Sequence, residues 1–135
     1  MLDFSKIKTQ EEMVSIVNSL KQQGKRVVAF NGAFDVLHCG HLGSLFKARD
    51  CGDALIILLN SDESIRSYRG PTKPIILEKE RAKMLAALSC VDYIVSFNEI
   101  NPKLVLDKIK PDILFTGDDW GKDCIEKEVM EKNGG

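Results

Sequence analysis

The sequence lacks any apolar run that approaches the ~20 residues needed to cross a membrane. Charged and polar side chains interrupt its first eleven residues, so the apolar stretch of a signal peptide is missing as well. Neither sign of charge dominates, because 19 Lys and Arg residues oppose 20 Asp and Glu residues for a formal net charge of −1. Affinity for nucleic acids or anionic membranes calls for a basic excess. We therefore expect a cytoplasmic protein that binds neither.

Cysteine is scarce, with four residues in the chain and no C-x-x-C pair. Three of the four lie in or beside predicted helices or strands. We therefore expect reduced, mostly buried thiols and no disulfide framework. Internal repeats, linkers and low-complexity segments are also missing, so residues 1–135 are expected to form one domain. The cysteines are Cys39, Cys51, Cys90 and Cys124.

Hydrophobic periodicity predicts strands and helices that alternate along the chain. The continuous apolar run 54–59 is typical of a strand buried on both faces of a parallel sheet. We therefore predict the α/β class, as a single-domain, Rossmann-like, doubly wound parallel sheet in an α/β/α sandwich. The predicted strands are 27–30, 54–59, 93–97 and 113–116, and the predicted helices are 9–23 (N-cap Thr9), 40–50, 62–68, 78–89, 101–109 (Pro102 at its first position) and 124–132.

Ligands of such sheets bind at the carboxyl ends of the strands. The turns that follow the first, second and fourth predicted strands open on that edge, so they are candidates to line one site. These turns are residues 31–41, 60–62 and 116–120.

The first of these turns runs from Asn31 to His41 and has two histidines at the start of a helix. A helix start presents unpaired N–H groups that attract anions. Two imidazoles beside such donors suit a phosphorus centre under attack, so we predict a nucleotide-phosphate site. One alternative is a pair of capping or core histidines. Another is a metal site built from Asp35, His38, Cys39 and His41, but zinc would require a third ligand at a suitable spacing.

A dinucleotide-binding dehydrogenase also has a glycine turn after its first strand. That fold needs G-x-G-x-x-G so that the backbone approaches the pyrophosphate. Here bulky Phe34 and Leu37 stand inside a wider gap, between Gly32 and Gly40. The dehydrogenase signature is therefore absent.

Residues 66–83 hold six cationic side chains against two acidic ones. We interpret Lys79 and Lys83 as part of a solvated helix face. Arg69 and Lys73 lie on a loop rich in glycine and proline, where they are placed to fold over phosphates like a lid.

The segment Thr116-Gly117-Asp118-Asp119-Trp120 follows the fourth predicted strand. By itself it is an ordinary glycine turn with an aspartate N-cap. At the carboxyl edge of the sheet, however, the same groups are suited to contact a nucleobase or ribose, with Trp120 as a stacking face.

The order Asn-Gly-x-Phe-Asp-x-Leu-His-x-Gly-His, from Asn31 to His41, resembles the signature of the cytidylyltransferase-like nucleotidyltransferases. The resemblance runs from about residue 8 to the end of the chain. It is closest to the D-glycero-β-D-manno-heptose 1-phosphate adenylyltransferases. The further matching positions are Asn60-Ser61-Asp62, the basic residues and glycine and proline positions within 69–74, Arg81, Val91-Asp92 and Gly134-Gly135.

The resemblance implies that a phosphate oxygen of an acceptor attacks the α-phosphorus of a nucleoside triphosphate and expels pyrophosphate. It implies that His38 and His41 stabilise the transition state, that Arg69 neutralises phosphate charge, and that Mg²⁺ travels with the triphosphate. A homodimer is also implied. The implied nucleotide-binding residues are Asn31, Gly32, Ala33, Phe34, His38, Gly40, His41, Gly117, Asp118, Asp119 and Trp120, and the implied phosphate or acceptor contacts are Asn60, Asp62, Arg69, Lys73 and Arg81.

The chain departs from the heptose pattern in the basic loop, in the turn after the fourth strand and at its end. Arg69 and Lys73 exchange the usual lysine and arginine, and Thr116 replaces a lysine. The Gly-Asp-Asp-Trp that follows is similar to bacterial glycerol-3-phosphate cytidylyltransferases. The family's late strand and Ser-Thr-Thr segment would follow Gly135, and we expect truncation there.

Several functions stay open on these grounds. The first is an adenylyltransferase that uses ATP and heptose 1-phosphate to form ADP-heptose. The second is a CTP-dependent glycerol-3-phosphate cytidylyltransferase or an FMN-type adenylyltransferase. The third is a nucleotide-binding module without turnover.

Overall fold

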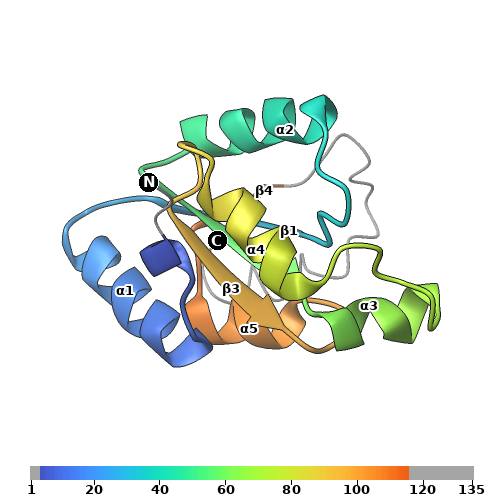
Figure 1. Ribbon diagram of the computed structural model, residues 1–135. Coiled ribbons are helices and arrows are strands. Elements are labelled where there is room, and N and C mark those ends of the chain that lie inside the picture. The colour runs from blue at the N-terminus through green and yellow to red at the C-terminus, as the bar shows by residue number, and fades with distance from the viewer. Residues whose placement is uncertain (1–3, 116–135) are drawn as a thin grey trace, which may run out of the picture.

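The computed structural model describes residues 4–115, in which four parallel strands form one sheet in the order β3-β2-β1-β4 (Figure 1). The predicted α/β class and the parallel sheet are confirmed. The central register pairs Val28 with Leu55 on one side and with Ile113 on the other. The strands are β1 Val27–Gly32, β2 Ala54–Asn60, β3 Tyr93–Phe97 and β4 Ile113–Phe115.

The helices lie close to their predicted positions. The helix predicted over 78–89 ends three residues early, because the N–H of Leu88 bonds the Leu85 carbonyl (3.1 Å) and closes a tighter turn. Pro102 is the N-cap of its helix rather than the first helical residue. The helix predicted over 124–132 lies outside the described residues. The helices are α1 Gln10–Gln22, α2 Cys39–Asp50, α3 Asp62–Arg69, α4 Glu78–Ala86 and α5 Lys103–Ile109, preceded by the 3-10 turn η1 Phe4–Lys6.

Strand β2 divides the core into two layers, because its side chains alternate between the two faces of the sheet. Leu55, Ile57 and Leu59 pack with α2 and α4. Ile56 and Leu58 pack with α1 and α5. Figure 1 shows α2 on the opposite side of the sheet from α1 and α5. All seven residues of β2 are buried, which confirms the sandwich predicted from this apolar run.

The first long helix begins as its sequence predicts. The Thr9 hydroxyl accepts a hydrogen bond from the Glu12 N–H (3.1 Å), and the Glu12 carboxylate accepts one from the Thr9 N–H (3.0 Å). This capping box satisfies two N–H groups that a helix start otherwise leaves unpaired. Its bonds to Thr9 lower the pKa of the Glu12 carboxyl.

Aspartates cap the amino edge of the sheet, opposite the edge where ligands are expected. Each carboxylate accepts a backbone N–H that no neighbouring strand satisfies. The bonds run from Arg26 to Asp53 (2.7 Å), from Val27 to Asp112 (2.8 Å) and from Leu55 to Asp92 (2.8 Å).

The three cysteines within residues 4–115 are free, but only one of them is buried, so the prediction of mostly buried thiols is wrong for these three. Cys39 and Cys51 are exposed because they stand at the first residue and at the C-cap of α2, where side chains project into solvent. Cys90 is buried, and burial raises the pKa of its thiol. Cys124 lies outside the described residues. Over residues 4–115, no helix is long and apolar enough to span a membrane.

Two glycines around α2 differ in the space for a side chain. A Cβ at Gly52 would lie 2.7 Å from the Val28 Cγ2 and 2.8 Å from the Arg26 carbonyl oxygen. A Cβ at Gly43, inside α2, would meet nothing within 4 Å. Only the first position therefore requires glycine for packing.

We predict that Gly52→Ala lowers the free energy of unfolding by about 1–3 kcal/mol, because the methyl group overpacks against the start of β1. Gly43→Ala is expected to raise it by about 0.5–1 kcal/mol, since alanine is the better helix former. Urea unfolding of both variants beside the wild type measures the difference. Equal effects at the two positions would contradict this account of the packing.

Candidate functional site

The chain leaves the sheet at the carboxyl end of β1, which pairs with β2 on one side and β4 on the other. The strand order reverses here, and ligands of doubly wound sheets bind at such a switch point. Residues 33–38 form the turn, and α2 begins at Cys39. The turn therefore brings the N-terminus of α2 to the edge where a ligand is expected.

Phe34 anchors this turn. Its backbone is left-handed (φ +49°), which turns its ring back over Gly32. A Cβ at Gly32 would lie 2.7 Å from that ring, so glycine is required there. The ring is buried and packs edge-on against Phe30, with centroids 5.6 Å apart, and against His41 at 5.5 Å. The aromatic contacts hold the turn beside the start of α2.

The two histidines cap the helix reciprocally. The His38 Nδ1 accepts a hydrogen bond from the Gly40 N–H (3.0 Å), and the His41 Nδ1 accepts one from the His38 N–H (3.1 Å). Their rings lie together, with centroids 3.9 Å apart. Both rings therefore gather at the helix start, as predicted. The capping role that was weighed as an alternative is also present, and it occupies only one nitrogen of each ring.

These caps determine which ring nitrogen faces outward with a proton. A neutral imidazole that accepts at Nδ1 carries its hydrogen on Nε2. Burial, and then the neighbouring His38, lower the pKa of His41, so its ring is neutral at pH 7. His41 is therefore an Nε2–H donor held in a fixed orientation by the backbone of its own helix.

Gly40 is needed for the same cap. A Cβ at this position would lie 2.8 Å from the Cε1 and 3.0 Å from the Nδ1 of His38. Only glycine leaves room for the imidazole to lie over the first turn of α2. The spacing His-x-Gly-His thus has a steric reason that is independent of any ligand.

A hollow of about 370 Å³ opens beside this turn. Arg69, at the end of α3, reaches it from a different part of the chain, with its guanidinium 5.3 Å from the centre of the Tyr68 ring. His38 and Gly40 are exposed at the helix start but do not line the hollow. The structure therefore brings together the predicted residues Asn31, Gly32, Ala33, Phe34, His41 and Arg69, which line the hollow with Phe30, Asp35 and Val36.

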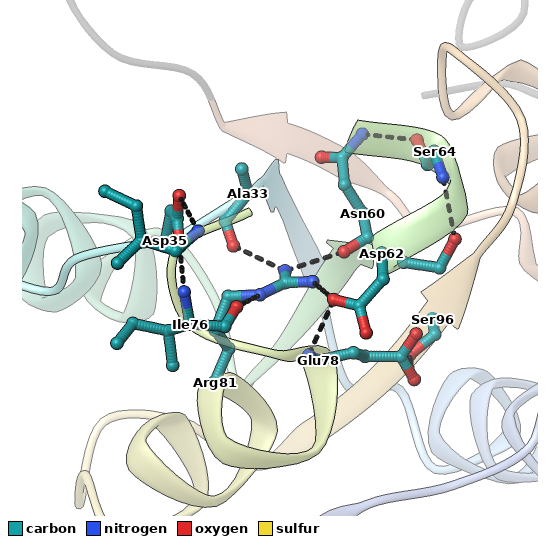
Figure 2. A network of polar contacts seen from close by, with 11 residues as sticks. Ala33, Asp35, Asn60, Asp62, Ser64, Ile76, Glu78, Arg81 and Ser96 are labelled. Carbon is teal, nitrogen blue, oxygen red and sulfur yellow. Dashed lines mark hydrogen bonds and ion pairs between the residues drawn. The ribbon is translucent and has the colours of Figure 1, made fainter. Parts of the chain in front are cut away.

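Arg81 does not line this hollow, and its role as a phosphate or acceptor contact stays a prediction. Its side chain is buried, at 1% exposure, within a polar network (Figure 2). Its guanidinium donates to one carboxylate and to three carbonyl oxygens. These acceptors are Asp62 Oδ1 (2.9 Å), Ala33 O (2.7 Å), Asn60 O (2.7 Å) and Ile76 O (2.9 Å).

Asn60 and Asp62 belong to the same network, and the prediction that they bind the acceptor stays a prediction. Asn60 is buried, and its amide donates to the Ser64 hydroxyl (3.0 Å). Asp62 Oδ1 also accepts the Glu78 N–H (2.8 Å), which ties α3 to the start of α4. The Asn60 amide and one carboxylate oxygen of Asp62 thus have protein partners, and these bonds connect the segments around the site.

Asp35 is the residue whose role sequence reasoning missed, since it was considered only as a possible metal ligand. Its carboxylate accepts the N–H groups of Ile75 (2.9 Å) and Ile76 (2.7 Å), forty positions further along the chain. Desolvation acts to raise the pKa of Asp35, but those two bonds, with Arg81 and Lys73 nearby, hold it below its usual value. No sequence pattern marks this pairing.

Lys73, the alternative metal site and residues 116–120 remain to be placed. Lys73 is half-buried in the loop between α3 and α4. Within residues 4–115 no three His, Cys, Asp or Glu side chains gather as a metal site would require. Thr116, Gly117, Asp118, Asp119 and Trp120 lie outside the described residues.

Comparison with known proteins agrees with this arrangement. The chain is 46% identical over 132 residues to the bifunctional protein HldE of Syntrophotalea carbinolica, and the match covers 97% of this chain and 27% of the relative. The HldE protein of Helicobacter hepaticus is 47% identical over 129 residues, which is 95% of this chain and 26% of the relative. The chain thus spans about a quarter of the length of these curated relatives.

A solved structure is similar to this chain as well. The lipopolysaccharide core biosynthesis protein of Thermoplasma volcanium superposes with a TM-score of 0.68 at 31% identity, over 82% of this chain and 87% of that one. The family described as cytidylyltransferase-like matches residues 29–134, a span that includes the histidine-bearing turn and Arg69. This chain therefore belongs to the cytidylyltransferase-like family.

Proposed function

We propose that the protein is a nucleotidyltransferase that transfers a nucleoside monophosphate from a nucleoside triphosphate to a sugar phosphate. The observation that carries this proposal is the hollow beside β1, which is lined by Arg69 and by His41, whose ring is oriented by its Nδ1 bond at the N-terminus of α2. All three features favour negative charge. Family membership supports the same reaction class.

In the proposed reaction, a phosphate oxygen of the acceptor attacks the α-phosphorus in line. The bond between the α-phosphorus and the bridging oxygen breaks, and its electron pair leaves with pyrophosphate. The Nε2–H of His41 stabilises the charge that grows on the α-phosphate oxygens, and His38, stacked against it, is proposed to do the same. Both donors are already oriented by their Nδ1 caps, so little reorganisation is needed during the reaction.

Arg69 and Lys73 are proposed to neutralise the β- and γ-phosphates. Arginine suits bidentate contact with phosphate oxygens, and lysine supplies a compact charge. In this proposal Mg²⁺ enters as part of the triphosphate substrate, held by phosphate oxygens.

For the substrates we propose ATP and heptose 1-phosphate, with ADP-heptose as product. Support comes from the motif resemblance, from the HldE relatives and from the neighbour described as a lipopolysaccharide core biosynthesis protein. A CTP-dependent glycerol-3-phosphate cytidylyltransferase is the second candidate, because Gly117-Asp118-Asp119-Trp120 is similar to those enzymes. A homodimer is proposed from the resemblance alone, and a cytoplasmic location from the composition.

Pyrophosphate release tests the proposal directly. The protein is mixed with ATP or CTP and with heptose 1-phosphate, glycerol 3-phosphate or FMN, each pair separately. We expect release with ATP and heptose 1-phosphate. Release with CTP and glycerol 3-phosphate would instead establish the second candidate. Nucleotide binding without release from any pair would leave only a binding module.

We predict that His41→Gln lowers kcat by ~10²-fold or more, a typical loss for one oriented transition-state donor. Glutamine at this third helical position keeps an acceptor for the His38 N–H, as in an ordinary capping box, but lacks the imidazole Nε2–H. The variant therefore separates catalysis from capping, and its melting temperature is expected to stay near that of the wild type.

The matched control is Cys39→Ala in the same helical turn, since Cys39 is exposed and bonds nothing in the site. Its turnover is expected to equal that of the wild type. Near-normal turnover of His41→Gln would mean that the chemistry lies elsewhere.

We predict that Arg69→Ala weakens triphosphate binding by ~10-fold or more and reduces the salt dependence of that binding. The reason is the loss of a charge-assisted contact of about 1.5–3 kcal/mol. Titrations of the triphosphate at two salt concentrations measure both effects. Arg66→Ala, one turn earlier in α3 and outside the hollow, is the control and is expected to change neither. If the two variants behave alike, Arg69 is only part of a solvated surface.

A further inference from the structure

The basic loop, residues 70–77 between α3 and α4, is held at its far end by the histidine-bearing turn. The two oxygens of the Asp35 carboxylate accept consecutive N–H groups, from Ile75 to Oδ2 (2.9 Å) and from Ile76 to Oδ1 (2.7 Å). Figure 2 shows Asp35 beside Ile76, with Arg81 next to both. One side chain of the turn thus fixes two successive peptide groups of the loop.

Apolar burial does not hold this part of the loop in place. Ile75 is 62% exposed and Leu77 is 58% exposed. The backbone of Ile76 makes two hydrogen bonds to side chains. Its N–H donates to the Asp35 carboxylate, and its carbonyl oxygen accepts from the Arg81 Nε (2.9 Å). Without much hydrophobic contact, these hydrogen bonds determine where the loop lies.

A negative charge at Asp35 is otherwise poorly suited to a phosphate site. Asp35 lines the same hollow as His41 and Arg69, so its carboxylate would repel a triphosphate there. Two backbone N–H bonds and the nearby cations Arg81 and Lys73 hold the pKa of this carboxyl below its usual value even though desolvation opposes them, so the group stays charged. A role in placing the loop explains why a carboxylate stands at this position.

We propose that Asp35 is a positioning residue that holds the basic loop against the histidine-bearing turn, and so keeps Arg69 and Lys73 at the triphosphate site. This inference rests on the proposed nucleotidyltransferase function. It assigns Asp35 no direct contact with the reacting atoms. Asp35 affects the substrate only by placing two cations, Arg69 at the border of the loop and Lys73 within it.

The test variant is Asp35→Asn, which keeps the size of the side chain. Asparagine offers one acceptor oxygen and places an N–H₂ group opposite the second backbone N–H. We expect the amide protons of Ile75 and Ile76 to exchange with solvent at least roughly tenfold faster by NMR. We also expect the KM for the nucleoside triphosphate to rise roughly tenfold, with a smaller change in kcat.

The sign of the change in KM separates positioning from simple electrostatics. If Asp35 acted only as a nearby charge, neutralising it would remove repulsion and lower the KM. If it positions the loop, the KM rises although a negative charge has been removed. A double variant gives a second test. We expect Lys73→Ala to raise the KM by a smaller factor in the Asp35→Asn protein than in the wild type.

Asp53→Asn is the matched control. Asp53 also accepts a backbone N–H, that of Arg26 (2.7 Å), but at the amino edge of the sheet. We expect faster exchange of the Arg26 amide and an unchanged KM. This control measures what the loss of such a bond does when it lies far from the basic loop.

The possible failures are distinguishable. A KM that stays constant or falls in Asp35→Asn, with the two amides exchanging faster, would overturn the positioning role and leave the nucleotidyltransferase proposal standing. Unchanged exchange of both amides would show that the bonds themselves do not hold the loop, which also overturns the role. Failure of the wild type to bind any nucleoside triphosphate would overturn the proposed function, and the role of Asp35 with it.

Discussion

A buried arginine must find an acceptor for nearly every N–H group, and Arg81 meets this requirement with oxygens from four segments of the chain. Ala33 belongs to the histidine-bearing turn, Asn60 ends β2, Asp62 begins α3, and Ile76 lies near the end of the basic loop. None of these segments moves away without leaving a buried donor unpaired, which is costly. Across the described residues no buried side-chain nitrogen or oxygen lacks a partner. The network therefore holds the edges of the hollow in one arrangement.

In the proposed reaction, each histidine serves folding and chemistry through different atoms. Their Nδ1 atoms satisfy N–H groups at the start of α2, and in doing so they direct Nε2–H outward. Capping and catalysis are therefore not competing explanations for this motif. The capping role requires glycine at position 40, since any side chain there would collide with the His38 ring.

The fold and the place of the site were predictable to a large extent, because both depend on local patterns. The apolar run of β2 indicated a strand covered on both faces, and its side chains alternate between two cores. Helix ends were less predictable, as the early end of α4 shows. The exposure of Cys39 and Cys51 was missed because tertiary packing decides whether a side chain at a helix end is buried, as Ile109 at the end of α5 is, or exposed.

The sequence by itself determined the parallel sandwich, the helix start with its two histidines and the identity of Arg69 as a cation of the site. These features depend on residues close together in the chain, or on the rule that parallel strands end at one edge. Only the tertiary structure decided that Arg81 is buried and that Asp35 bonds a loop forty residues away. The physical reason is that a charged side chain has the same sequence signature whether its partner is a phosphate or a distant peptide group. The surrounding packing alone selects between them.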